Sequence, residues 1–178
     1  MKKALFLSLL LMTVLNLISQ RAEAPERRIL ITQDFKFPLG YPDLKGYHDA
    51  KPFGTNGHLG CDLNKDGGGN NDLGDTIRAI GHGFVSISAE ARICLVHKTN
   101  IEQYPYITSV YFHCDEVFVE YGEFVYQGQP IGTVGNKLTH YAHLHFEIIT
   151  DTTSYLGGGF YGYNTGACVD PVEFINKY

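Results

Sequence analysis

The sequence predicts an all-β protein, in which about seven strands form an antiparallel, partly closed sheet with long loops and a short C-terminal helix. Apolar and polar residues alternate over short runs, which is the period of a strand. Glycine and asparagine separate these runs, and only the C-terminal end carries helix signals. The 178 residues, 44% of them hydrophobic, suffice for one packed domain.

The first element is a leader. Lys2 and Lys3 precede an apolar run over 4–18, and a short polar stretch with the small residues Ala22 and Ala24 follows. This order is typical of a secretory signal peptide, and the run is too short to favour a membrane span. We expect residues 1–24 to be the signal, 25–178 to form the single mature domain, and the protein to be secreted, into the periplasm or outside the cell. Pro25 after the expected cleavage site leaves an uncleaved anchor as the alternative.

The remaining elements follow in order. Strand patterns cover 28–32, 57–63, 83–89, 92–96, 106–114, 129–134 and 142–149. The segment 64–74 is rich in turn-forming residues and predicts a loop. Residues 171–177 predict a helix, with Asp170 as its N-cap and Pro171 at the first helical position.

Charge and cysteine content exclude some classes of function. The net charge is −5, and a nucleic-acid partner is therefore excluded, because phosphate contacts need a basic surface. All four cysteines (Cys61, Cys94, Cys114, Cys168) lie in the exported part, where they permit two disulfides in three pairings or remain buried thiols.

A first group of polar residues lies at His58 and Asp62. On a strand both side chains point to one face, while Leu59, Cys61 and Leu63 point to the other. Gly60 lies between the two polar groups and is expected to leave space for an ion.

A second group lies at His143 and His145, which share one face of the strand predicted at 142–149. A catalytic zinc ion commonly takes three protein ligands and keeps one position for water. His58, Asp62 and one histidine of this pair supply such a set. In a third segment, alternation places Phe112 in the core and His113 on the opposite side, as a further proton carrier.

Together these segments resemble one family. Gly57-His58-Leu59-Gly60-Cys61-Asp62, Tyr111-Phe112-His113 and His143-Leu144-His145-Phe146-Glu147 follow the order of motifs in the lysostaphin-type zinc metallopeptidases. One residue is missing before the first histidine, but the His-x-x-x-Asp spacing is kept. The resemblance covers the core motifs over 56–148 and implies that 25–178 is a metallopeptidase-like catalytic domain.

The resemblance implies a zinc-dependent endopeptidase that hydrolyses peptide bonds of bacterial peptidoglycan. Its metal ligands would be His58, Asp62 and His145, and a Zn²⁺-bound water would attack the peptide with the assistance of His113 and His143. Peptidoglycan peptides would be the substrate, and no stable membrane span is expected after signal cleavage.

Several other interpretations remain open. Asp62, Asn64 and Asp66 resemble the start of a calcium loop, but its twelfth position is Leu73 and no helices flank it. Cys61 is better explained as a buried sulfur than as a nucleophile. Glu147 would either orient a histidine or be a surface charge. The other histidines are expected to be surface or structural residues: His48, His82, His97 and His140.

Two alternative functions compete with the peptidase. One is an exported, non-catalytic regulator or binding module that activates other cell-wall hydrolases. The other is a non-haem iron enzyme, because two histidines and one carboxylate also bind iron.

Overall fold

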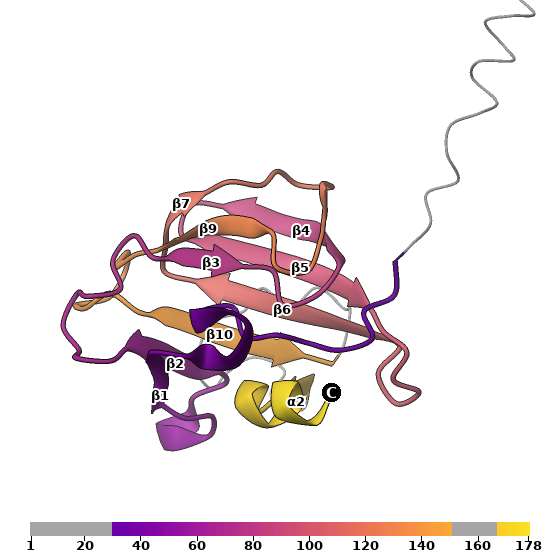
Figure 1. The fold of residues 1–178 in the computed structure, drawn as a ribbon, viewed down its shortest axis with the longest axis horizontal. Helices are drawn as coiled ribbons and strands as arrows, with labels where there is room; N and C mark the ends of the chain where they lie inside the picture. Colours follow the sequence, from indigo (N-terminus) through magenta and orange to yellow (C-terminus); the bar gives the residue numbers. More distant parts are fainter. Residues whose placement is uncertain (1–29, 151–166) are drawn as a thin grey trace, which may run out of the picture.

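The structure, a computed structural model, describes residues 30–150 and 167–178 (Figure 1). The leader expected at 1–24 lies outside these residues. Within the described part, no helix is both long and apolar enough to cross a bilayer. Of the strand expected at 28–32, the described end makes only a single bridge, between Thr32 and Thr99.

Eight strands form the large sheet, and all neighbours in it are antiparallel. Its order is β1-β2-β10-β6-β5-β4-β8, and β11 pairs with β10 beside β2. The strands are β1 (Tyr47–Lys51), β2 (Cys61–Lys65), β4 (Gly83–Ala89), β5 (Arg92–Lys98), β6 (Tyr106–Phe112), β8 (Phe124–Val125), β10 (Leu144–Ile149) and β11 (Cys168–Val169). The order does not return on itself, so the sheet is open at β1 and β8.

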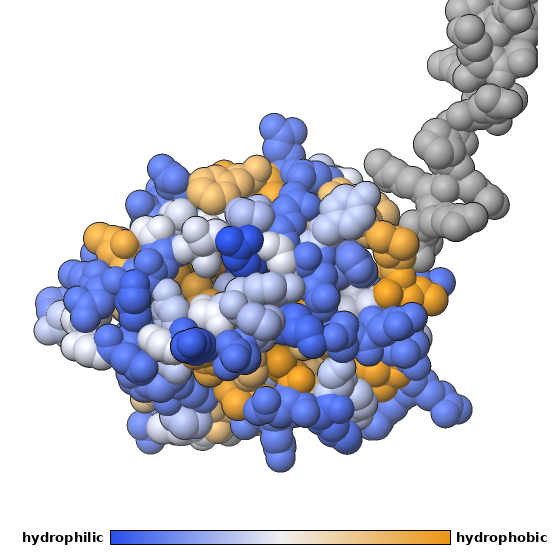
Figure 2. All heavy atoms as spheres, viewed as in Figure 1, coloured by the Kyte–Doolittle hydropathy of each residue, from blue (hydrophilic) through white to orange (hydrophobic). Residues whose placement is uncertain are grey.

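A second sheet of three strands lies across one face of the large one (Figure 1). Its order is β3-β9-β7, with β3 at Thr76–Arg78, β9 at Pro130–Val134 and β7 at Cys114–Val117. The main hydrophobic core fills the space between the two sheets, where Ile77 and Ile131 meet Tyr111 and Phe146. Helix α2 (Pro171–Lys177) lies at the bottom of the view in Figure 1 and adds Phe174 and Ile175 to the core. Over the small sheet the molecular surface is mainly polar, with separate apolar spots (Figure 2).

The two faces of β10 have different roles. Leu144, Phe146 and Ile148 belong to the main core, so alternation directs His145 and Glu147 to the opposite face. Register extends that face across the sheet, because His145 lies opposite Asp62 on β2 and opposite Phe112 on β6. Both faces of β10 are buried throughout. The polar residues of this strand therefore lie in a protected layer.

An all-β fold with a C-terminal helix is confirmed, and β4 and α2 have the expected bounds. Asp170 caps the helix, its Oδ1 accepting from the backbone N–H groups of Val172 and Glu173. The described residues contain eleven strands rather than about seven, because β1, β3, β7, β8 and β11 are short or weakly alternating. All four cysteines are buried thiols rather than disulfides.

Candidate metal centre

Asp62 and His145 face each other on adjacent strands. They are register partners of β2 and β10, and Asp62 Oδ1 lies 2.9 Å from His145 Nδ1. The side chain of Asp62 retains 16% of its exposure and that of His145 only 5%. Strand pairing alone thus places a carboxylate oxygen and an imidazole nitrogen next to each other.

His58 reaches the same point from a turn rather than from a strand. The expected strand over 57–63 begins only at Cys61, and a 3-10 turn (η2, Thr55–Gly57) precedes His58. His58 Nε2 lies 3.1 Å from Asp62 Oδ1 and 2.9 Å from His145 Nδ1. The side chain of His58 therefore meets Asp62 and His145 as the spacing predicts, although the expected strand geometry is wrong.

Gly60 has a different role from the one expected. A Cβ atom on it would lie 2.3 Å from the carbonyl oxygen of Phe146 and 2.8 Å from Cγ of Glu147. The position is occupied by the neighbouring strand, so it does not provide space for an ion. Glycine is needed there because the backbone of β10 approaches so closely.

The hydrogen-bond partners of the two histidines leave lone pairs directed at one point. His58 Nδ1 donates to the carbonyl of Lys51 at 2.9 Å, so in the neutral ring Nε2 is an acceptor. His145 Nε2 donates to Glu147 Oε1 at 2.7 Å, so in the neutral ring Nδ1 is an acceptor. With Asp62 Oδ1 they form the group of possible ligand atoms in the described residues, all within 4.8 Å of one another.

These neighbouring acceptors favour a positive charge between them. Burial lowers the pKa of His145, but hydrogen bonds with Asp62 and Glu147 outweigh it and raise the pKa to about 9. Burial likewise raises the pKa of Asp62, but hydrogen bonds with His145 and His58 bring it well below its usual value. A divalent cation would satisfy the same lone pairs. Two nitrogens and one carboxylate oxygen match the ligand set of a catalytic zinc site.

His143 lies beside this group without belonging to it. Its Nδ1 donates to the carbonyl of Tyr141 at 3.0 Å, which leaves Nε2 as an acceptor in the neutral ring. Nε2 lies 3.7 Å from Asp62 Oδ1, farther than the ring nitrogens of His58 and His145. Its side chain retains 15% of its exposure, so solvent can reach it.

His113 is also brought to the site, but not by alternation along a strand. Tyr111, rather than Phe112, faces the core, and β6 ends at Phe112. His113 has a φ of +66°, and this left-handed residue turns the chain from β6 into β7. Its Nδ1 donates to the carbonyl of Lys137 at 2.7 Å, and its ring lies 4.7 Å from that of His143, centroid to centroid. Burial lowers the pKa of His113 to about 4.

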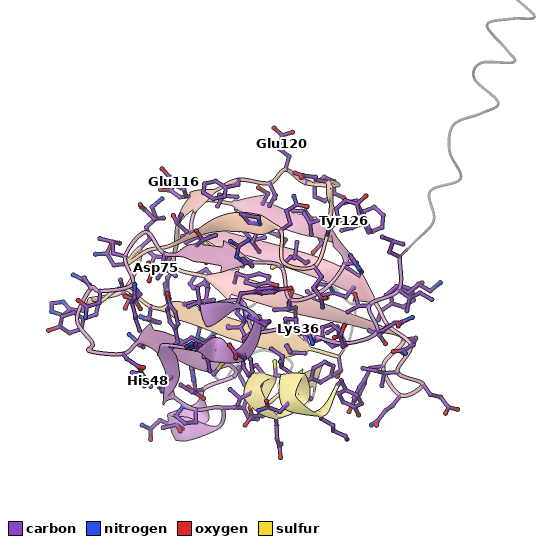
Figure 3. All side chains as sticks on the ribbon, in the orientation of Figure 1. Lys36, His48, Asp75, Glu116, Glu120 and Tyr126 are labelled. Carbon is purple, nitrogen blue, oxygen red and sulfur yellow. The ribbon has the colours of Figure 1, made fainter. Side chains whose placement is uncertain are left out.

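The remaining candidates lie elsewhere. His140 is exposed, His97 is buried in the core, and His48 pairs with Asp66 at 3.1 Å on the outer edge of β1 (Figure 3). Because Asp66 binds His48 and Asp62 faces the histidines, the described residues of the loop do not assemble a calcium site. Cys61 is fully buried on the core side, and burial raises the pKa of its thiol, which disfavours a nucleophile.

Three groups that orient the histidines are not assigned by the sequence. Glu147 is fully buried against His145 and is not a surface charge. The carbonyls of Lys51 and Lys137 orient His58 and His113. Backbone carbonyls carry no residue-type signal, so only the folded chain reveals them.

Known proteins resemble this chain in sequence pattern and in fold. Residues 56–156 match the model of the family described as peptidase family M23. No curated protein matches the chain significantly.

Solved structures share the fold. Lysostaphin from Staphylococcus simulans aligns with a TM-score of 0.54 and 21% identity over 74% of this chain and 50% of its own. Its catalytic domain aligns with a TM-score of 0.53 and 22% identity over 75% of this chain and 95% of its own. A structure assigned to peptidase M23 from Pseudomonas aeruginosa aligns with a TM-score of 0.51 and 18% identity over 85% of this chain and 52% of its own. The chain thus spans about half the length of the complete lysostaphin.

Proposed function

Because the chain belongs to peptidase family M23, we propose that it is an exported zinc-dependent endopeptidase that hydrolyses peptide bonds of bacterial peptidoglycan. The observation that carries this proposal is the convergence of His58 Nε2, Asp62 Oδ1 and His145 Nδ1, with both ring protons held on the opposite sides of the rings. Lysostaphin, described in its structure as an antimicrobial peptidase, has the same fold.

His58, Asp62 and His145 would bind the zinc ion. When bound, zinc supplies a Lewis acid that polarises the scissile carbonyl and activates a water molecule. Strands β2 and β10 hold two of the ligands at a fixed register, so little reorganisation is needed when the ion binds. Glu147 keeps the ring of His145 in the tautomer that a metal requires.

His113 and His143 would move the protons of the reaction. Each ring donates its Nδ1 proton to a backbone carbonyl, which directs Nε2 toward the site as a base in the neutral ring and a donor in the protonated one. The low pKa of His113 keeps this ring neutral near pH 7, as an acceptor of a proton must be. The pair can take a proton from the attacking water, stabilise the oxyanion and return a proton to the leaving amine.

The test combines metal analysis of the purified protein with digestion of purified sacculi. We expect close to one equivalent of zinc, and release of peptides that stops with a chelator and resumes when zinc is added. A zinc-loaded protein that binds sacculi and releases no peptides would contradict the proposal and support the regulator. Activity that requires iron and a reductant would instead support the iron enzyme.

A further inference from the structure

The residue before His143 is held by two asparagine side chains. The N–H of Ala142 donates to Asn70 Oδ1 at 2.8 Å, and the carbonyl of Ala142 accepts from Asn64 Nδ2 at 3.2 Å. Ala142 is fully buried, so both backbone groups need partners within the protein. The two amides thus satisfy both polar groups of one residue.

These bonds continue the connection between β2 and β10 beyond the end of their ladder. The backbone pairing of the two strands ends with Leu144 opposite Leu63. Asn64 follows directly on β2, and Asn70 lies in the loop after that strand. Side chains from the ligand-bearing segment therefore bind Ala142 where the backbone of β2 no longer does.

The same stretch carries few other restraints on His143. Its N–H donates to the carbonyl of Gly135 at 3.3 Å, and its ring contacts the carbonyl of Tyr141. Residues Leu138, His140 and Tyr141 of the preceding loop are exposed. Without the two asparagines, the backbone entering His143 would leave buried polar groups unsatisfied and would shift toward water.

We propose that Asn64 and Asn70 are positioning residues that set His143 at the distance from the metal ligands at which it transfers a proton. This inference rests on the function proposed above. It assigns a role to the segment after Asp62 that ligand spacing does not indicate, and it links a metal-binding strand to a proton carrier.

One asparagine accepts a hydrogen bond from Ala142 and the other donates one to it, so the same substitution should affect the two positions differently. Asn70 contributes only an acceptor, so Asn70→Asp preserves the bond to Ala142 and Asn70→Ala removes it. Asn64 contributes a donor, so Asn64→Asp places a carboxylate against a carbonyl and is as harmful as Asn64→Ala. Asn71→Ala is the matched control, since Asn71 is exposed in the same loop and the two backbone groups of Ala142 are bound by Asn70 and Asn64 instead.

The experiment measures kcat, KM and zinc content of these variants, together with hydrogen exchange of the Ala142 amide. We expect Asn64→Ala, Asn64→Asp and Asn70→Ala to lower kcat by about tenfold to a hundredfold, with KM and zinc content kept. Asn70→Asp and the control should stay within about twofold of the unsubstituted protein. The Ala142 amide should exchange faster in Asn70→Ala and at the normal rate in Asn70→Asp.

Unchanged kcat in Asn64→Ala and Asn70→Ala, with faster exchange at Ala142, would overturn the proposal. Loss of zinc in these variants would also overturn it, because the asparagines would then support Asp62 rather than His143. Failure of the proposed function has a separate signature. In that case the unsubstituted protein cleaves no peptidoglycan, whatever the exchange rates of the variants.

Discussion

Glu147 and His145 are joined by a hydrogen bond of 2.7 Å between Oε1 and Nε2, beneath the proposed zinc ligands. Glu147 is fully buried on the site face of β10, two residues beyond the histidine. The carboxylate fixes which ring nitrogen carries the proton and increases the electron density at Nδ1. The structure thus contains an outer carboxylate of the kind that tunes metal-ligating histidines.

Glu147→Gln should weaken zinc binding by about tenfold to a hundredfold, because a neutral amide orients the ring but supports its basicity less. The measurement is competition for zinc with a chelator of known affinity. The control is Glu116→Gln, since Glu116 extends from the protein surface (Figure 3). Equal zinc affinity in Glu147→Gln and the unsubstituted protein would show that the carboxylate does not tune the ligand.

His113→Ala and His143→Ala should each keep zinc and lower turnover by about a hundredfold to ten-thousandfold, the usual contribution of a proton carrier. His145→Ala, in contrast, should lose zinc and turnover together. The readouts are zinc stoichiometry and peptide release from sacculi. His140→Ala serves as the control, because His140 is exposed. Full activity in His113→Ala would remove that residue from the mechanism.

The convergence of His58, Asp62 and His145 could be predicted from sequence because it depends on few structural variables. The spacing of His58 and Asp62, and the period-two relation of His143 to His145, survive errors in strand bounds. Pairing of β2 with β10 brings together Asp62 and His145, which lie 83 positions apart in the sequence. No local pattern encodes that register, so the choice of His145 over His143 depends on the family resemblance.

The expectations for Phe112 and Gly60 are wrong for physical reasons. Alternation placed Phe112 in the core, but the core residue is Tyr111, whose hydroxyl accepts from the N–H of Ile80 at 3.1 Å and so satisfies a buried polar group. A glycine at position 60 predicts open space, because a sequence shows a missing side chain but not the strand that fills its place. Backbone partners such as Lys51 are chosen by the fold alone.

His97 should make stability depend on pH. Its Nδ1 donates to the carbonyl of His82 at 2.9 Å and its Nε2 lies 2.7 Å from Ser109 Oγ, which has to donate to the neutral ring. Burial lowers the pKa of His97 to about 4. In the unfolded chain this pKa has its ordinary value of about 6.5. As pH falls, the unfolded chain therefore binds a proton before the folded chain does.

The stabilisation by neutral His97 is complete above pH ~6.5 and is lost progressively as pH falls to ~4, by up to about 3 kcal/mol. The check is the free energy of unfolding in urea at several pH values, for the unsubstituted protein and His97→Gln. Other titrating groups cancel in the difference between the two. That difference should shrink between pH ~6.5 and ~4, and a constant difference would refute the assignment.

Gly60→Ala should destabilise the fold by about 2–4 kcal/mol, because its methyl group would collide with the backbone of β10. The nearest atoms are the carbonyl oxygen of Phe146 at 2.3 Å and Cγ of Glu147 at 2.8 Å, and the first cannot rotate away. Relief would require β2 and β10 to separate next to the Asp62–His145 pair. Zinc affinity should therefore fall together with stability.

Gly46→Ala is the control, because Gly46 has a φ of +81° and nothing lies within 4 Å of the added carbon. This variant should lose about 1 kcal/mol of unfolding free energy and keep its zinc binding unchanged. Thermal unfolding and zinc competition on both variants provide the measurement. If Gly60→Ala proved as stable as Gly46→Ala, then close packing at Gly60 would not be what holds the two ligand strands together.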